Sequence, residues 1–141
     1  MGYIDPVCAP KRNVAVDTSI SVLVVDDSKT TLRIVCQMLQ ECGFNNIAEA
    51  PNGVAAFEQL RTGKFDLVIS DVGMAPMNGI ELLQAVRADR ILQDTCFILM
   101  TALRETANIL ATKEYKADAV LLKPFTAEIM KKELLRVDKL K

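Results

Sequence analysis

Short apolar runs alternate with amphipathic segments along the chain, and this alternation limits the fold more strongly than any other feature of the sequence. Four of the five runs are nearly continuous in apolar residues, which is typical of strands that are buried on both faces. We interpret the runs as strands of one parallel sheet. They are SVLVV (Ser21–Val25), NIAEA (Asn46–Ala50), DLVIS (Asp66–Ser70), CFILM (Cys96–Met100) and AVLL (Ala119–Leu122).

Between these runs the apolar residues recur at helical spacing. Strand and helix therefore alternate five times, which predicts an α/β domain whose parallel sheet is covered by helices on both faces, with right-handed crossovers. The helical stripes are Leu32/Val35/Cys36/Leu39 before a stop at Gly43, Val54/Phe57/Leu60, Ile80/Leu83/Val86 after Gly79, a weaker one around Ile109, and Met130/Leu134/Val137 with Thr126 as the N-cap.

The composition fits a single compact domain of 141 residues, half of them hydrophobic. Residues 1–20 carry Pro6 and Pro10 and no periodicity, so we expect a flexible arm there and a folded domain over residues 21–141. The formal net charge of -1 gives no basic field for nucleic acid. The sequence has no apolar run long enough to span a membrane and no signal peptide, so we expect a cytoplasmic protein that binds neither membrane nor nucleic acid.

The chain contains no histidine, which excludes Ser/His/Asp triads, His-based zinc sites and histidine proton shuttles. Its four cysteines form no CxxC pair, and we interpret them as reduced thiols. Chemistry in this chain must therefore come from carboxylates, hydroxyls and amines.

Such groups stand at the ends of the predicted strands. Asp26 and Asp27 follow the first strand, Asp71 the third, Thr101 the fourth and Lys123 the fifth. Each residue alone has an ordinary explanation as a turn former, a helix cap or a surface charge. Ligands of open α/β sheets, however, bind at the carboxyl ends of the strands, so the joint pattern predicts a site there.

The chemistry of this set points to phosphoryl transfer. Two adjacent carboxylates about 5 Å apart repel by about 3 kcal/mol at an effective dielectric near 20, and a divalent cation would offset that repulsion. Oxygen ligands of this kind suit Mg²⁺, with a phosphoryl oxygen completing its shell. Asp71 stands opposite the pair and is the natural nucleophile, so we predict an aspartyl phosphate.

These residues also carry a resemblance. The set Asp26-Asp27, Asp71, Thr101-Ala102 and Lys123-Pro124 resembles the receiver domain of two-component response regulators, and within that family the stand-alone chemotaxis regulators. Three further stretches match, namely GFNNIAEAPNGVAAFEQL, NGIELLQAVRAD and KPFTA, so that the likeness runs from about residue 21 to 135. The resemblance implies a flavodoxin-like (βα)5 fold with strand order 2-1-3-4-5.

It further implies that Asp71 accepts a phosphoryl group from a histidine kinase. By the same analogy, Asp27, Asp71 and the backbone carbonyl of Gly73 ligate Mg²⁺ directly, and Asp26 acts mainly through water. Thr101 and Lys123 then hold the phosphoryl oxygens, and the Lys123-Pro124 peptide bond is cis. A phosphatase is a possible second partner.

The output is expected on a protein-binding face made of residues 105–115, 119–122 and 126–140. The switch residues there are Thr101, Val120, Tyr115 and Pro124. Relatives usually carry an aromatic ring at the position of Val120, so a rotating ring cannot report phosphorylation in this chain. The loop after Asp71 also departs from the family, with alanine at Ala75 and proline at Pro76.

Two further departures concern the phosphoryl lifetime. Gly73 and Leu103 stand where side chains modulate phosphoryl loss in the family, so we expect an altered lifetime.

Three alternatives to a signalling receiver stay open at this point. We expect no attached effector domain, so the chain could serve as a phosphate sink for a shared kinase. An aspartyl phosphatase of the haloacid dehalogenase type is disfavoured because Gly73 stands where such enzymes place their general acid. A degenerate receiver that binds partners without chemistry is disfavoured because every residue that the chemistry needs is present.

Overall fold

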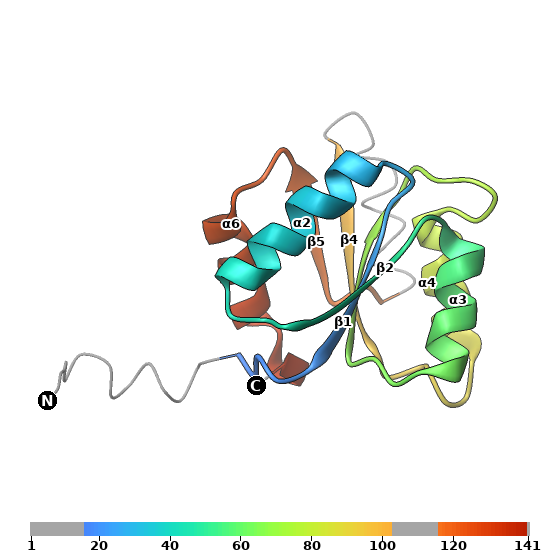
Figure 1. Ribbon diagram of the computed structural model, residues 1–141. Helices are drawn as coiled ribbons and strands as arrows, with labels where there is room; N and C mark the ends of the chain where they lie inside the picture. Colours follow the sequence, from blue (N-terminus) through green and yellow to red (C-terminus); the bar gives the residue numbers. More distant parts are fainter. Residues whose placement is uncertain (1–15, 103–115, 141) are drawn as a thin grey trace, which may run out of the picture.

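The computed structural model describes residues 16–102 and 116–140. In this part of the chain, strands and helices alternate as predicted (Figure 1). The predicted helix around Ile109 lies outside the described residues, and so do Tyr115, Leu103 and Cys8. The elements are β1 (Ser21–Val25), α2 (Lys29–Glu41), β2 (Asn46–Ala50), α3 (Gly53–Thr62), β3 (Leu67–Asp71), α4 (Gly79–Ala88), β4 (Cys96–Ala102), β5 (Ala119–Lys123), α6 (Ala127–Arg136) and the 3-10 turn η3 (Asp138–Leu140).

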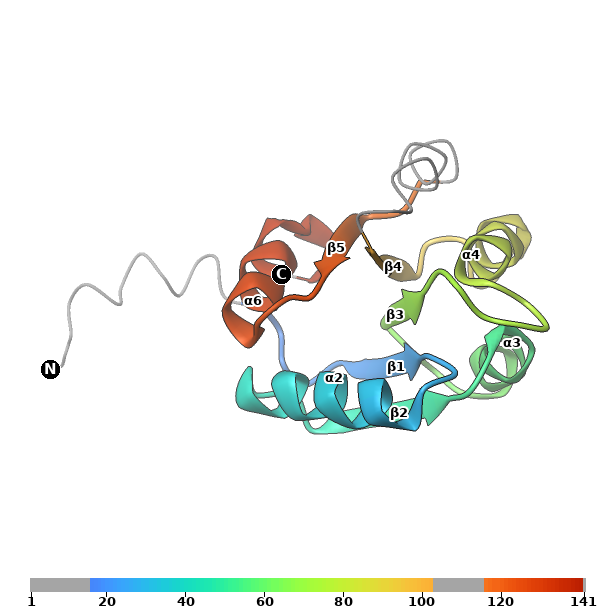
Figure 2. The same cartoon turned by 90° about the horizontal axis from the view of Figure 1, so that it is seen from above.

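The sheet has five parallel strands in the order β2-β1-β3-β4-β5. This confirms the flavodoxin-like order that the resemblance implied. Viewed from above, α2 and α6 lie on one side of the sheet, and α3 and α4 lie on the other (Figure 2). The structure is thus a three-layer α/β domain, as the alternation of runs and stripes predicted.

Two hydrophobic cores lie on the two faces of the sheet. One joins β-strand residues such as Val24 and Ile98 to Leu39 of α2 and Leu134 of α6. The other joins the alternate strand residues, such as Leu23 and Leu99, to side chains of α3 and α4. Successive side chains of one strand therefore pack into the two cores in turn, which explains why the central strands are continuous in apolar residues.

The helices begin at side-chain caps. The Ser28 and Thr126 hydroxyls accept hydrogen bonds from the N–H groups of Thr31 and Ile129, both at 3.2 Å, which confirms Thr126 as an N-cap. Asn52 caps α3 in the same way. Asn78 and Glu81 form a reciprocal capping box at the start of α4. Side-chain caps thus fix where each helix starts above the strand ends.

The strands extend further than their apolar runs. Asp71 is the last residue of β3 and pairs with Met100, and Thr101 belongs to β4, where it pairs with Leu122. We had predicted that β3 covers Asp66–Ser70, and the observed strand begins and ends one residue later. The ladder to the neighbouring strand, and not hydrophobicity, sets where each strand ends.

Residues 16–20 lie against the domain. The Asp17 N–H donates to the Leu140 carbonyl at 2.9 Å, and the side chains of Val16 and Ile20 pack on the core beside α2 and α6. The last residues of the predicted arm are therefore in contact with η3 and the core. Among the described helices, none is both long and apolar enough to cross a membrane.

Candidate functional site

The predicted site residues come together at the carboxyl end of the sheet. Asp26 directly follows β1, and Asp71 ends β3. Thr101 and Lys123 belong to the last two residue pairs between β4 and β5. Because all five strands are parallel, these ends meet at one edge. The arrangement brings together residues from four segments that are up to 97 positions apart in the sequence.

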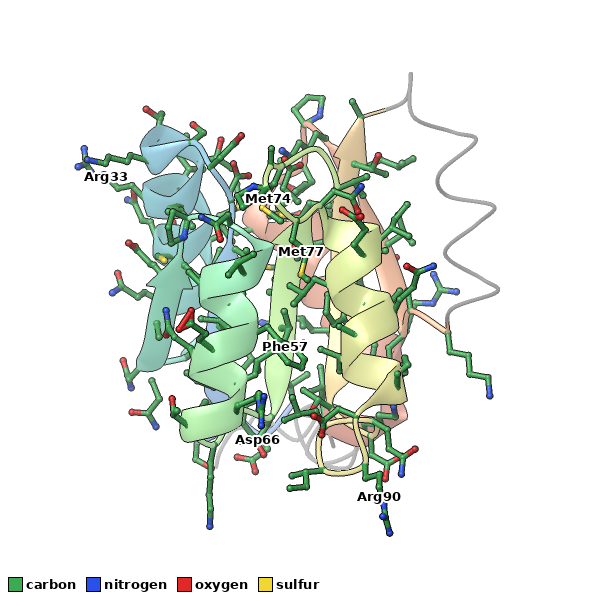
Figure 3. The ribbon with its side chains drawn as sticks, turned by 90° about the vertical axis from the view of Figure 1, so that its right-hand side faces the viewer. Arg33, Phe57, Asp66, Met74, Met77 and Arg90 are labelled. Atoms are coloured by element: carbon green, nitrogen blue, oxygen red, sulfur yellow. The ribbon has the colours of Figure 1, made fainter. Side chains whose placement is uncertain are left out.

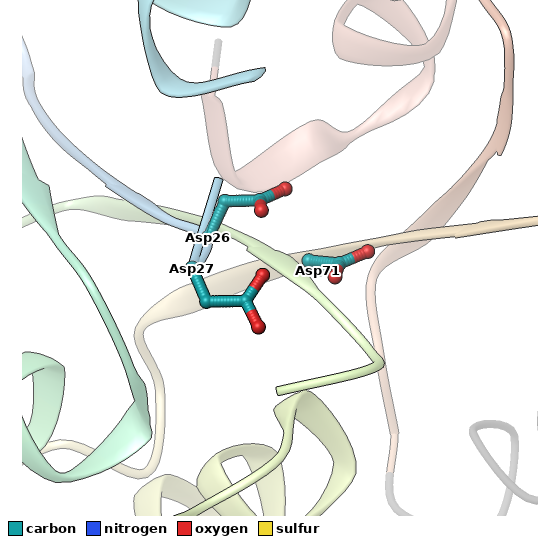
Figure 4. Close-up of side chains that lie close together, drawn as sticks. All are labelled: Asp26, Asp27 and Asp71. Atoms are coloured by element: carbon teal, nitrogen blue, oxygen red, sulfur yellow. The ribbon is translucent and has the colours of Figure 1, made fainter. Parts of the chain in front are cut away.

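Three carboxylates form the centre of the site. One carboxylate oxygen each of Asp26, Asp27 and Asp71 lies within 4.8 Å of the other two (Figure 4). Asp26 and Asp71 are buried, with 2% and 8% of their surface exposed, whereas Asp27 is exposed. Such a cluster of hard oxygen ligands, open on one side, fits a divalent cation of the Mg²⁺ type.

Lys123 provides the positive charge of the site. Its Nζ lies 2.7 Å from Oδ1 of Asp71 and 3.5 Å from Oδ2 of Asp26. One ammonium group therefore bridges two of the three carboxylates. Within the described residues, the third carboxylate, Asp27, forms no ion pair with Lys123, and it is exposed to solvent.

The pKa values of Asp26 and Lys123 are both raised, for different reasons. Burial raises the pKa of Asp26, and the Asp71 charge adds to this effect, while the Ser28 N–H and Lys123 oppose it. Burial alone would lower the pKa of Lys123, but its hydrogen bond to Asp71 and the charges of Asp71 and Asp26 outweigh burial and raise it. Lys123 therefore stays protonated at neutral pH, and a bound cation would favour the charged form of Asp26 against its burial.

The backbone around Asp71 is held from several sides. The buried Ser70 hydroxyl donates to the Asp71 carbonyl at 2.9 Å. Gly79, the first residue of α4, donates its N–H to the Val72 carbonyl at 3.0 Å. A Cβ atom at Gly79 would collide with the Asp71 carbonyl group and approach the Val72 Cα to 3.0 Å. The absence of a side chain at Gly79 thus allows α4 to start directly against the strand end that carries Asp71.

The loop between β3 and α4 also contacts α3. The Gly53 N–H donates to the Met77 carbonyl at 3.1 Å, and a Cβ atom at Gly53 would lie 2.6 Å from Cγ of Met77. Met74 and Met77 both lie on the side of the molecule where α3 and α4 face the viewer (Figure 3). Gly73 is exposed in this loop, two residues past Asp71. Two glycines therefore set the position of the loop that carries Gly73.

The comparisons with known proteins agree with this geometry. The sequence profile of the response regulator receiver domain matches residues 22–135. The chain belongs to the receiver domain family of response regulators. It is 36% identical to the chemotaxis protein CheY of Pseudomonas aeruginosa over 118 residues, which are 84% of this chain and 95% of that protein.

Further relatives support the same family. Chemotaxis protein CheY-3 of Vibrio cholerae is 36% identical over 119 residues, covering 84% of this chain and 92% of CheY-3. Among solved structures, the chemotaxis response regulator CheY4 of Vibrio cholerae superposes with a TM-score of 0.77 at 33% identity, covering 85% of this chain and 99% of CheY4. A receiver domain of a histidine kinase from Syntrophus aciditrophicus gives a TM-score of 0.77 at 28% identity, over 84% and 89% of the two chains. The chain is thus a CheY-related receiver domain of two-component signal transduction.

Not every predicted residue of this receiver domain touches Asp71. Thr101 is buried, and its hydroxyl lies 3.4 Å from the Ala102 carbonyl. No hydrogen bond joins Thr101 to Asp71 within the described part of the chain. Val120 is half-buried in β5, opposite Leu99, and Pro124 is exposed.

The Lys123-Pro124 peptide bond is cis, as the resemblance implied. A second cis bond joins Ala75 and Pro76, in the loop where the proline departs from the family position.

Sequence reasoning missed the residues that hold the backbone of this receiver site in place. Gly79 carried a signal, because it opens a helical stripe, but only the structure shows its contact with Asp71. Ser70 carried none, since a serine at the end of an apolar run is ordinary. Ser28 had a signal of its own as the polar residue before the first helical stripe.

Proposed function

We propose that Asp71 accepts a phosphoryl group from a histidine kinase in a Mg²⁺-dependent reaction, and that the phosphorylated chain signals by a change in protein binding. The observation that carries this proposal is the cluster of three carboxylates with Lys123 Nζ at 2.7 Å from Asp71. Membership of a family whose CheY relatives are chemotaxis proteins supports it. On this proposal the chain catalyses only its own phosphoryl transfer and phosphoryl loss.

The carboxylates of Asp26, Asp27 and Asp71 and the backbone carbonyl of Gly73 would hold the Mg²⁺ ion, with Asp26 acting mainly through water. When bound, the ion neutralises charge on the carboxylates and on the phosphoryl oxygens. Burial still disfavours the charged form of Asp26 despite Lys123 at 3.5 Å, so a second cation at this site would stabilise its carboxylate.

In the transfer step, a carboxylate oxygen of Asp71 forms a bond to phosphorus while the P–N bond of the kinase phosphohistidine breaks. The electron pair of that bond returns to the imidazole of the kinase, which then takes a proton. Lys123 offers its ammonium group to the phosphoryl oxygens, and Thr101 offers its hydroxyl. Lys123 is already in place, since it bonds to Asp71 before the reaction.

The output surface proposed is β5, α6 and residues 105–115. Thr101, Val120, Tyr115 and Pro124 are its proposed switch residues. Leu122 of β5 and Ile129 of α6 are large apolar residues that stay about half exposed, which suits a surface that binds a protein target. We place this receiver in the cytoplasm, with residues 21–141 as the receiver domain and residues 1–20 as an arm.

A phosphate sink is the second candidate, and Val120 favours it. The half-buried Val120 has no ring that could reorient between a buried and an exposed position. Phosphorylation-dependent capture of a protein target on β5 and α6 would argue for the signalling receiver. A phosphorylated form that loses its phosphoryl group and can be phosphorylated again, but binds no target, would argue for the sink.

Intact-mass analysis tests the proposed chemistry. The protein is incubated with acetyl phosphate, with and without Mg²⁺, beside Asp71→Asn. A matched control is Asp94→Asn, which removes an exposed carboxylate away from the site. We expect one Mg²⁺-dependent, hydroxylamine-labile adduct in the wild type and in Asp94→Asn, and none in Asp71→Asn. An adduct that survives in Asp71→Asn would overturn the assignment of the acceptor.

A further inference from the structure

A groove of about 660 Å³ lies between α2 and the last residues of β2, beside the carboxylate site and outside it. Its lining combines apolar side chains, such as Leu32, with polar and charged side chains of α2. Grooves of this size admit a ligand of several residues or a small organic molecule. The lining residues are Lys29, Leu32, Arg33, Cys36, Gln37 and Gln40 of α2, and Glu49, Ala50 and Pro51 of β2 and the turn after it.

Two exposed cations mark the rim of the groove. Lys29 and Arg33 are exposed and lie four positions apart on α2, so they share one face of the helix. Within the described residues, no acidic side chain lies within ion-pair distance of either one. Arg33 projects away from α2 into solvent at the side of the molecule where β2 forms the edge (Figure 3). These charges are available to a ligand.

Glu49, the acidic residue of the groove lining, is hydrogen-bonded to the helix wall. Oε2 of Glu49 accepts a hydrogen bond from the Cys36 thiol at 3.2 Å. Gln37 and Gln40 continue the rim beyond Arg33 and offer amide groups that both donate and accept hydrogen bonds. On the helix rim of the groove, the part at Lys29 and Arg33 is therefore basic, and the part at Gln37 and Gln40 is suited to hydrogen bonds.

The other wall of the groove is the end of β2, and the free edge of this strand extends back from the groove to Ile47. β2 is the outermost strand and pairs only with β1 in the described sheet. The Ala50 carbonyl bonds to the Asp26 N–H on the side of β1, so the alternate residues Ile47 and Glu49 direct their peptide groups to the free side. In agreement, the Glu49 carbonyl accepts its hydrogen bond from the Gln59 side chain and not from a strand. An edge of this kind is a template for an added strand.

From these three features we infer that the groove between α2 and β2 binds an extended acidic segment of a partner protein. The segment pairs with the free edge of β2 at Ile47, and its carboxylates face Lys29 and Arg33. Main-chain hydrogen bonds supply the affinity and the two cations supply the charge preference, as in other cases of strand addition. A single-stranded nucleic acid fits less well, because the groove has no aromatic side chain on which a base could stack.

This binding requires neither phosphorylation nor Mg²⁺, so its test is independent of the proposed acceptor. The probe is a short peptide of alternating valine and glutamate with both ends blocked, titrated into the ¹⁵N-labelled full chain without Mg²⁺. Two matched peptides differ only in lysine for glutamate, or in methylated backbone nitrogens along the pairing edge. We expect saturable shifts at the amide resonances of Ile47 and Glu49 with the acidic peptide only, and the same shifts in Asp71→Asn.

Charge-reversal variants locate the site. Arg33→Glu and the double variant with Lys29→Glu should weaken binding of the acidic peptide by about tenfold or more. Lys132→Glu makes the same charge change on the exposed face of α6 and should leave the affinity unchanged. The inference is overturned if the basic or the methylated peptide binds equally well, if Arg33→Glu binds as tightly as the wild type, or if a single-stranded oligonucleotide shifts Ile47 and Glu49 more strongly than the peptide does.

Discussion

The ammonium nitrogen of Lys123 lies 2.7 Å from Oδ1 of Asp71, although β4 separates the two strands that carry these residues. Lys123 can reach Asp71 across β4 because its side chain is long and both strands end at the same edge. This ammonium group neutralises part of the carboxylate cluster before any metal or phosphoryl group is bound. It therefore has two opposite effects, since it competes with a divalent cation and it stabilises an incoming phosphoryl group.

The substitution Lys123→Met separates these two effects. We expect the Mg²⁺ affinity to rise several-fold, because a competing cation has left the buried carboxylates, and the rate of adduct formation with acetyl phosphate to fall by at least about tenfold. Calorimetric titration with Mg²⁺ and time-resolved intact mass measure the two quantities. Lys132→Met, on the exposed face of α6, is the control and should change neither. An unchanged rate of adduct formation in Lys123→Met would rule out the proposed role of Lys123.

A methyl group at Gly79 should disturb Asp71 without touching its side chain. The new Cβ atom would collide with the Asp71 carbonyl group, which is held in β3 by strand pairing and cannot move aside. We expect Gly79→Ala to lower the free energy of unfolding by about 1–3 kcal/mol, and to slow adduct formation in the fraction that stays folded. Urea denaturation and intact mass measure the two effects.

Gly63→Ala is the matched control for Gly79→Ala. A Cβ atom at Gly63 would lie 3.2 Å from its nearest neighbours, the Gln59 carbonyl oxygen and the Phe65 ring. It would not collide with backbone as the Cβ atom at Gly79 would. Its effect on the free energy of unfolding should be smaller, and adduct formation should proceed as in the wild type. If both substitutions changed the free energy of unfolding and adduct formation equally, the close contact between Gly79 and Asp71 could not be the cause.

Arg87 is a charged residue whose substitution should lower the free energy of unfolding. Its guanidinium group donates to the carbonyls of Gln93, Thr95 and Lys116 and to the carboxylate of Asp118, over 2.7–3.2 Å. It is the group that ties the end of α4 to the loop before β4 and to the start of β5. Its side chain is only 14% exposed.

The substitution Arg87→Lys should therefore cost about 1–3 kcal/mol of unfolding free energy, since an ammonium group cannot reach these four acceptors at once. Equilibrium unfolding in urea measures the loss. The control is Arg136→Lys. The Arg136 side chain is 77% exposed and pairs with Glu133, and the cost of this substitution should stay below about 0.5 kcal/mol. A loss in Arg87→Lys no larger than in Arg136→Lys would show that the buried hydrogen bonds contribute little.

The fold and the centre of the site could be predicted from the sequence, because both follow from local patterns. Apolar runs are strands wherever both faces of the sheet are covered, and the carboxyl ends of parallel strands must meet at one edge. Asp26, Asp71 and Lys123 were found in this way, and the structure brings them within hydrogen-bonding distance. The strand order itself came from the resemblance and not from the residues.

The contacts that support the fold and the site could not be predicted, because they join segments that are distant in the sequence and leave no local pattern. Arg87 reads as a surface residue of an amphipathic helix, and its acceptors are mostly carbonyls, which every residue carries. Val16 and Ile20 are isolated apolar residues without periodicity, yet they pack on the core. The groove likewise depends on the packing of α2 beside β2, which brings Lys29 and Arg33 of the helix next to the edge strand.

The contact between Cys36 and Glu49 predicts an unreactive thiol at the wall of the groove. Burial, followed by the hydrogen bond and the charge of Glu49, raises the pKa of Cys36 to about 12. A raised pKa leaves less thiolate at about pH 8, so alkylation of Cys36 by iodoacetamide should be slow and should keep rising about tenfold per pH unit to about pH 10, where an ordinary thiol has levelled off. Glu49→Gln removes the nearby charge, lowers the pKa of Cys36 and should speed alkylation at about pH 8 several-fold, whereas Glu58→Gln on the exposed face of α3 should not. Peptide mapping by mass spectrometry follows Cys36 alone, and equal rates in the two variants would mean that Glu49 does not control this thiol.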